Sequence, residues 1–155
     1  MLRLLLPSLM LFLSFQYGAV AHSSTFENCY KNFNNTIHQD ILISFPMLKE
    51  LAERDDTWNY SYEDLIKMNA ILGKEDSHLI SLVELFRGTS IGERQLIIVN
   101  GKYSPNWGNA FTGYLFYKDV KGVNILLEIK RGKKEWEVVK KRKVQGKYIT
   151  LEKNC

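Results

Sequence analysis

The residues that could do chemistry in this chain of 155 residues are few and scattered. The three histidines, His22, His38 and His78, form no grouping with Cys, Asp or Glu at the spacing that metal sites use. Neither Cys29 nor Cys155 lies in a reactive-site motif, and the chain has no Gly-x-Ser-x-Gly elbow or phosphate-binding loop. We therefore predict a protein that is not an enzyme and has no catalytic residue, metal or cofactor.

Basic side chains are concentrated in the C-terminal part of the chain. Residues 118–147 hold eleven Lys or Arg and four Asp or Glu, whereas residues 22–117 hold eight basic and twelve acidic residues. Such clusters attract sulfated glycans or anionic lipid headgroups through their summed field. They serve equally as a solubility device, because Lys on a strand edge discourages pairing with another chain. The polyanion-binding candidates are Lys130, Arg131, Lys133 and Lys134 at one hairpin tip, and Lys140, Lys141, Arg142 and Lys143 in a run predicted to enter the next turn.

Six aromatic residues occur between Tyr103 and Tyr117. Trp107 falls in the loop between two predicted strands, and it is a candidate partner-binding residue because exposed Trp side chains often anchor protein interfaces. The alternative is that Trp107 pins the loop or joins the core, since aromatic side chains have large areas to bury.

Residues 1–21 have the three-part order of a secretory signal peptide. Arg3 precedes an apolar run, and small residues at Ala19 and Ala21 predict cleavage after Ala21. The alternative is an uncleaved membrane anchor, which needs about 20 apolar residues to cross the hydrocarbon. We expect a secreted protein with no membrane span after cleavage and no nucleic-acid partner.

An oxidising compartment would favour a disulfide bridge between Cys29 and Cys155. The ring closed by this bridge spans nearly the whole mature chain, and the loop-entropy model values such a ring at about 4–5 kcal/mol. Two free thiols are the alternative. Asn34 and Asn59 begin N-x-[ST] motifs, so both are candidate glycosylation sites.

Residues 26–87 show mainly the apolar spacing of helices with one buried face. In the first helix the predicted buried stripe is Phe33, Ile37, Ile41 and Leu42. Pro46 ends this helix because it removes a backbone amide. Ser44 is predicted to cap a second, short helix that reaches Arg54.

Ser61 and Asp64 resemble a capping box at the start of a third helix, and Gly73 is its predicted stop. A fourth helix follows, with an apolar stripe predicted to be buried: Leu79, Leu82, Val83 and Phe86.

From Arg94 onward the pattern changes to short strands rich in β-branched and aromatic residues. Asn100-Gly101 predicts a hairpin turn, because both residues tolerate positive φ. Ile125, Leu127 and Ile129 alternate with Leu126, Glu128 and Lys130, which predicts a sheet with one wet face. The predicted strands are residues 96–99, 111–117, 123–130, 135–139 and 148–151.

Short turns between these strands require antiparallel neighbours. The predicted fold class is therefore α+β, with N-terminal helices packed on one face of a four- to five-stranded antiparallel meander. Residues 22–155 are expected to form a single α+β domain, with the helical part at about 26–87 and the sheet part at about 94–152.

Part of this pattern resembles a known family. Between residues 82 and 151 the matching pieces are Gly92, residues 113–117, Val120-Lys121-Gly122, residues 123–129, Trp136 and residues 146–151. They are similar to the small domain of the cytochrome c oxidase assembly factor family, which shares its fold with a mitochondrial inner-membrane translocase subunit. Members of that family are anchored assembly factors without known catalysis, so the resemblance implies the α+β fold and a partner-binding role.

The sequence thus favours a secreted, non-enzymatic binding protein that engages a protein partner or a polyanion, the latter through its basic hairpins. Two alternatives stay open. One is a membrane-anchored assembly factor of the mitochondrial inner membrane, as the resemblance implies. The other is a small secreted enzyme or inhibitor without a recognisable motif.

Overall fold

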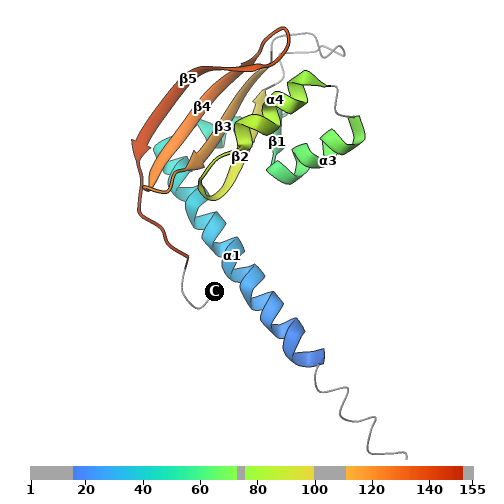
Figure 1. Ribbon diagram of the computed structural model, residues 1–155. Coiled ribbons are helices and arrows are strands. Elements are labelled where there is room, and N and C mark those ends of the chain that lie inside the picture. Colours follow the sequence, from blue (N-terminus) through green and yellow to red (C-terminus); the bar gives the residue numbers. More distant parts are fainter. Residues whose placement is uncertain (1–15, 73–75, 100–110, 152–155) are drawn as a thin grey trace, which may run out of the picture. The chain divides into compact units, whose positions relative to one another are not determined.

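The computed structural model describes residues 16–72, 76–99 and 111–151 (Figure 1). The chain divides into two compact units. The larger unit is Thr36–Ile149, and the smaller one combines Met1–Asn35 with Thr150–Cys155. Helix α1 (Gln16–Ser44) begins in the smaller unit and ends in the larger one.

The smaller unit carries a row of aromatic rings on α1. The ring centroids of Phe26 and Tyr30 lie 6.3 Å apart, as do those of Tyr30 and Phe33, at the four- and three-residue spacings that bring side chains together on a helix. Of the predicted leader, residues 1–15 lie outside the described residues and the rest belongs to α1. Among the described residues, no helix combines the length and the apolar character needed to cross a membrane.

Helix α2 (Met47–Ala52) follows directly on Pro46. Pro46 is its N-cap residue, and within the described residues no side-chain hydrogen bond caps the start of the helix. The prediction that Ser44 caps this helix is wrong, because Asn124 Nδ2 on the sheet donates a hydrogen bond to Ser44 Oγ (2.8 Å). The Ser44 hydroxyl therefore fixes the end of α1 to the sheet.

Helix α3 (Tyr62–Leu72) begins as predicted. The backbone amide of Ser61 donates to Asp64 Oδ2 (2.8 Å), and the Asp64 amide donates to Ser61 Oγ (3.3 Å). These reciprocal bonds confirm the capping box, with Asp in place of the usual Glu or Gln. The predicted stop at Gly73 lies outside the described residues.

Helix α4 (Ser77–Phe86) is capped by Asp76, whose carboxylate accepts hydrogen bonds from the backbone amides of His78 and Leu79. An Asp at this position satisfies amides that have no partner within the helix. All four residues of the predicted stripe are buried: Leu79, Leu82, Val83 and Phe86.

Five strands form one antiparallel sheet in the order β1-β2-β3-β4-β5, so each strand pairs with its neighbours in sequence (Figure 1). The strands are β1 (Thr57–Tyr60), β2 (Ile91–Val99), β3 (Thr112–Lys118), β4 (Val123–Arg131) and β5 (Trp136–Gln145). This arrangement confirms the predicted α+β fold with an antiparallel meander. β1 and β5 are its two edges.

Two strand predictions are wrong. β1 lies in the segment predicted to be helical, and its four residues are too few to show an alternation; pairing with β2 holds it in the sheet. Residues 148–151 form no strand, because β5 continues to Gln145 and occupies the edge beside β4 over that whole length. The predicted turn at Asn100-Gly101 lies outside the described residues, although β2 and β3 are antiparallel neighbours.

One face of the sheet packs against α3 and α4 in a continuous apolar core. Leu115 and Ile129 at the centre of the sheet have no exposed surface, and Trp136 at the start of β5 is 8% exposed. Gly113 on β3 is required by close packing, since a Cβ there would lie 2.8 Å from Ile129 Cγ1. The apolar faces of α3 and α4 stay packed on the apolar face of the sheet because this contact removes both from water.

The opposite face of the sheet is exposed to solvent at only one end. Glu128 is half-buried and Lys130 is exposed, as the alternation predicts, but Leu126 is buried. The last turns of α1 and helix α2 cover this part of the sheet, where the rings of His38 and Phe116 lie 6.0 Å apart. Burial of His38 lowers the pKa of its imidazole, although a hydrogen bond with Gln95 acts in the other direction.

A buried ion pair ties α1 to β3 under the same face. Lys118 has no exposed surface, and its Nζ donates to Asp40 Oδ2 (2.6 Å), to Lys147 O (2.9 Å) and to Gly122 O (3.3 Å). Three acceptors thus satisfy all three ammonium protons, which is the condition for a charge to be tolerated in a protein interior.

The carboxylate of Asp40 also has several hydrogen-bond donors around it. Its Oδ2 also accepts from Asn124 Nδ2 (2.7 Å) and from the Lys147 amide (3.2 Å). Burial alone would raise the pKa of this carboxyl, but the hydrogen bonds from Lys118 and Asn124 outweigh it and hold the pKa below 3.8. The backbone of Gly146 packs directly against this cluster. A side chain does not fit there, because a Cβ would lie 2.5 Å from Lys118 Nζ.

Candidate functional site

Strand β5 presents the most basic surface of the described chain. Among the described strands it pairs on one side only, with β4, and every residue of β5 after Trp136 is exposed. An edge strand of this kind offers backbone amides and carbonyls on its free side together with its side chains. β5 also carries four of the eight predicted polyanion-binding residues: Lys140, Lys141, Arg142 and Lys143.

The four consecutive basic residues lie in the middle of β5, which runs on to Gln145. The prediction that this run enters a turn is therefore wrong. Lys141 and Lys143 stand opposite Leu127 and Ile125, whose side chains belong to the core under α3 and α4, so both lysines point to that face of the sheet.

Lys140 and Arg142 stand opposite Glu128 and Leu126 and point to the other face. Arg142 reaches α2, where its Nη1 lies 3.8 Å from Met47 Sδ. The basic edge, defined here as Lys140, Lys141, Arg142 and Lys143, thus projects positive charge on both sides of the sheet rim.

None of the basic edge residues takes part in an ion pair within the described residues. The ion pairs found there use Arg54, Lys67, Arg87 and Lys118 instead. The acid nearest in register is Glu128, directly opposite Lys140. The charge of the basic edge is therefore mostly uncompensated and free to attract an external anion.

Lys133 and Lys134 form a separate basic group in the bend between β4 and β5, where both are exposed. Lys140, the nearest residue of the basic edge, follows Lys134 by six positions, which at about 3.3 Å per strand residue is at most about 20 Å. Fields add over a Debye length of about 8 Å at physiological salt. At that separation the two groups act as separate patches of positive charge. Lys130 is exposed and stands opposite Glu137 at the end of β4.

Arg131 does not join these surface groups. It is half-buried, and its guanidinium carbon lies 5.8 Å from the centroid of the Phe111 ring. The sequence held a signal for this position, because Arg131 continues the two-residue period of the core-facing residues of β4, which are Ile125, Leu127 and Ile129.

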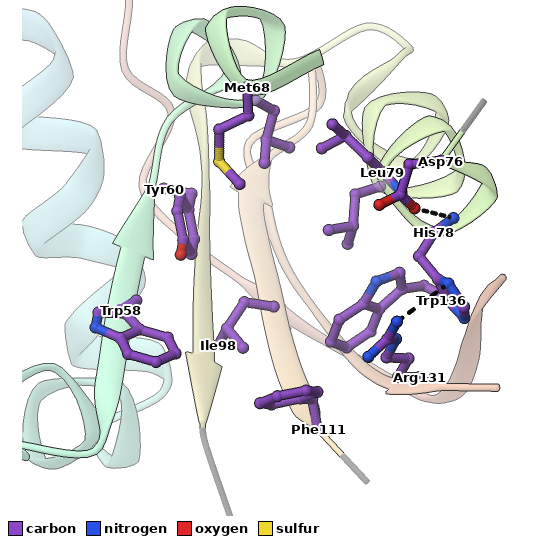
Figure 2. Close-up of a pocket in the computed structure, with 12 residues that line it drawn as sticks. Trp58, Tyr60, Met68, Asp76, His78, Leu79, Ile98, Phe111, Arg131 and Trp136 are labelled. Carbon is purple, nitrogen blue, oxygen red and sulfur yellow. Dashed lines mark hydrogen bonds between the residues drawn. The ribbon is translucent and has the colours of Figure 1, made fainter. Parts of the chain in front are cut away.

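The side chain of Arg131 lines a cavity of about 260 Å³ between the sheet and helices α3 and α4 (Figure 2). Most of its wall is apolar, and Figure 2 shows Tyr60, Met68 and Ile98 across the cavity from Arg131. The lining residues are Trp58, Tyr60, Leu65, Met68, Asp76, His78, Leu79, Leu82, Ile98, Phe111, Arg131 and Trp136.

Polar groups meet at one end of this cavity. Arg131 Nη2 lies 3.3 Å from His78 Nδ1, and His78 Nε2 lies 3.0 Å from Gly132 O. Arg131 Nη1 is buried and has no hydrogen-bond partner among the described residues. Asp76, on the same rim, uses its Oδ1 to cap α4. Sequence reasoning missed this arrangement because Arg131 and His78 lie on elements far apart in the chain.

The remaining predicted site residues fall in different places. Cys29 lies half-buried on α1, but Cys155 lies outside the described residues, so the bridge between them stays a prediction. Asn34 is half-buried on α1 and Asn59 is exposed on β1, and their glycosylation also stays a prediction. Trp107 lies outside the described residues.

The described residues contain no group of three or more His, Cys, Asp or Glu side chains that could hold a metal ion. Comparison with known proteins adds no family: no protein-family model, no curated protein and no solved structure matches this chain. The likeness to cytochrome c oxidase assembly factors therefore remains a resemblance in sequence pattern.

Proposed function

We propose that this chain is a secreted, non-enzymatic binding protein whose basic edge engages an anionic polymer such as a sulfated glycan. One observation carries the proposal: four consecutive basic side chains stand exposed on an edge strand, and none of them pairs with an acid among the described residues. The leader pattern, the two sequons and the cysteine pair support the extracellular location.

The geometry suits a polymer better than a small anion. Consecutive strand residues point alternately to opposite faces, so Lys140 and Arg142 cannot converge with Lys141 and Lys143 on one small group. A flexible chain with repeated charges can instead lie along the rim and contact both pairs. Binding of this kind releases counterions and weakens steeply as salt rises.

The competing explanation is that the lysines only keep an exposed strand edge from pairing with another chain. Heparin-affinity chromatography of two charge-matched variants separates the two explanations. In the first variant Lys140, Lys141, Arg142 and Lys143 are replaced by Gln. In the control, the same replacement is made at four exposed positions elsewhere: Lys31, Lys49, Lys67 and Arg87.

We expect the basic-edge variant to leave heparin at a much lower salt concentration than the control, with a shallower dependence of affinity on salt. Thermal unfolding should change little, because exposed charges each contribute only about 0–1 kcal/mol. If both variants elute at the same salt concentration, retention reflects net charge alone and the basic edge is a solubility device.

A further inference from the structure

The cavity under α3 and α4 combines an apolar body with a single cationic end. Trp58, Met68 and Trp136 contribute apolar surface, whereas Arg131 is the cation in its wall. Pockets that bind small molecules are mostly apolar with a few polar groups, and this space of about 260 Å³ has that composition.

The guanidinium of Arg131 is only partly satisfied. Its Nη2 is directed at His78, but its Nη1 is buried with no partner, and none of the ion pairs in the described chain includes Arg131. Asp76 also lines the cavity; its Oδ1 accepts the capping bonds of α4, and it makes no ion pair with Arg131 among the described residues. Burying a charged donor without a partner costs free energy that an incoming acceptor would recover.

The hydrogen bonds of His78 fix the orientation of the Arg131 side chain. Gly132 O can only accept, so His78 Nε2 must carry the proton in its contact with that carbonyl. Arg131 can only donate, so His78 Nδ1 must accept. Both contacts fit the imidazole tautomer with its proton on Nε2, and Nδ1 then orients the guanidinium of Arg131.

We propose that this cavity binds a small amphipathic carboxylate, with its carboxylate on Arg131 and its hydrocarbon chain against Trp58, Met68 and Trp136. A carboxylate supplies both the missing acceptor and the missing counter-charge, and Arg pairs with it by strong, charge-assisted bonds. The apolar wall gains by removing the hydrocarbon chain from water.

The volume limits the size of the ligand. A cavity of about 150 Å³ holds benzene, and drug-sized ligands occupy pockets of about 300 Å³ and above. A space of about 260 Å³ lies between these limits. Octanoate is a suitable probe because it combines a medium-length chain with one carboxylate.

Titration with octanoate, followed by tryptophan fluorescence and by calorimetry, tests the site at neutral pH. Trp58 and Trp136 both line the cavity, so their emission reports its occupancy. Octanol is the matched neutral probe, with the same chain and no charge. We expect saturable binding of octanoate and weaker binding of octanol.

Arg131→Gln should weaken octanoate binding roughly 10- to 100-fold, the range expected for a lost charge-assisted hydrogen bond, and should change octanol binding little. The control is Lys130→Gln, which removes the same charge from the neighbouring exposed position on the other face of β4. Lys130→Gln should leave the affinity for octanoate unchanged.

Met68→Trp fills the cavity from α3 while Arg131 stays in place, and it should abolish the binding of both probes. Unfolding curves verify that each variant is folded. The proposal is wrong if wild-type protein shows no saturable signal with octanoate up to millimolar concentrations, or if it binds octanol as tightly as octanoate. This site is independent of the basic edge, so the basic-edge variant should bind octanoate normally.

Discussion

At the scale of single residues, the ion pair of Lys118 and Asp40 places two charges in the protein interior, where each needs a partner. The two residues lie 78 positions apart and meet where α1 crosses β3, with Asn124 bonded to both the side chain and the backbone of Asp40. A buried pair gains little over apolar residues of the same volume, but removal of one partner leaves an uncompensated charge. The cluster therefore fixes the position of α1 more than it adds stability.

Asp40→Asn should lower the free energy of unfolding by about 3–5 kcal/mol at neutral pH, because Lys118 remains buried without its counter-charge. Since the folded-state pKa of Asp40 lies below 3.8, its stabilising contribution is full above that value and is lost as the pH falls through the folded-state pKa. The difference between wild type and variant should thus shrink below about pH 4.

Urea unfolding across a pH series measures this difference. A double variant, Asp40→Leu with Lys118→Met, removes both charges and should regain part of the lost stability. A difference between wild type and Asp40→Asn that stays constant from neutral to acidic pH would contradict the role given to this carboxylate.

At the scale of elements, β5 joins two unlike surfaces. Its first residue, Trp136, is buried against α4, where its backbone amide donates to Ser81 Oγ (2.9 Å), and the rest of the strand is exposed. A register shift between Glu128 and Ile129 marks a bulge in its pairing with β4. Bulges re-aim side chains along a strand, so this one separates the core end of β5 from its basic edge.

Trp136→Ala should lower the free energy of unfolding by about 3–5 kcal/mol, the cost of a large-to-small change in a core. Val138→Ala is the matched control, because Val138 lies on the same strand and is 46% exposed; its effect should stay below about 0.5 kcal/mol. Denaturant unfolding compares the two. Equal losses for both variants would show that β5 is not held through Trp136.

At the scale of the whole molecule, the two compact units differ in what holds them. The larger unit contains the complete sheet and its apolar core, whereas the smaller one combines the start of the chain with its end. A covalent link between Cys29 and Cys155 would join the two parts of the smaller unit. Such links act mainly by restricting the unfolded chain.

Peptide mapping of secreted protein without reduction should recover the peptides of Cys29 and Cys155 as one linked species. Cys155→Ser should lower the melting temperature by several degrees, because the ring is large. Cys29→Ser should have the same effect, and the double variant should lose no more than either single one. Alkylation of both cysteines in unreduced protein would exclude the bridge.

The sequence by itself determined the local features of this protein. The capping box of Ser61 and Asp64, the buried stripe of α4 and the antiparallel order of β3 and β4 all follow from side chains a few residues apart. Hydrogen bonds and apolar periodicity at this range are set by the helix and strand repeats, so they can be recognised without knowledge of the fold.

Only the tertiary structure decided what β1, Lys118 and Arg131 do. β1 is a strand because it pairs with the edge of β2. Lys118 can be buried because Asp40 on α1 supplies its counter-charge. Arg131 lines a cavity because α3 and α4 pack over its end of the sheet. The same packing brings His78 to Arg131 from 53 positions away. Each outcome depends on groups distant in the chain, whose meeting is fixed by the packing of helices on the sheet and leaves no repeat in the local sequence.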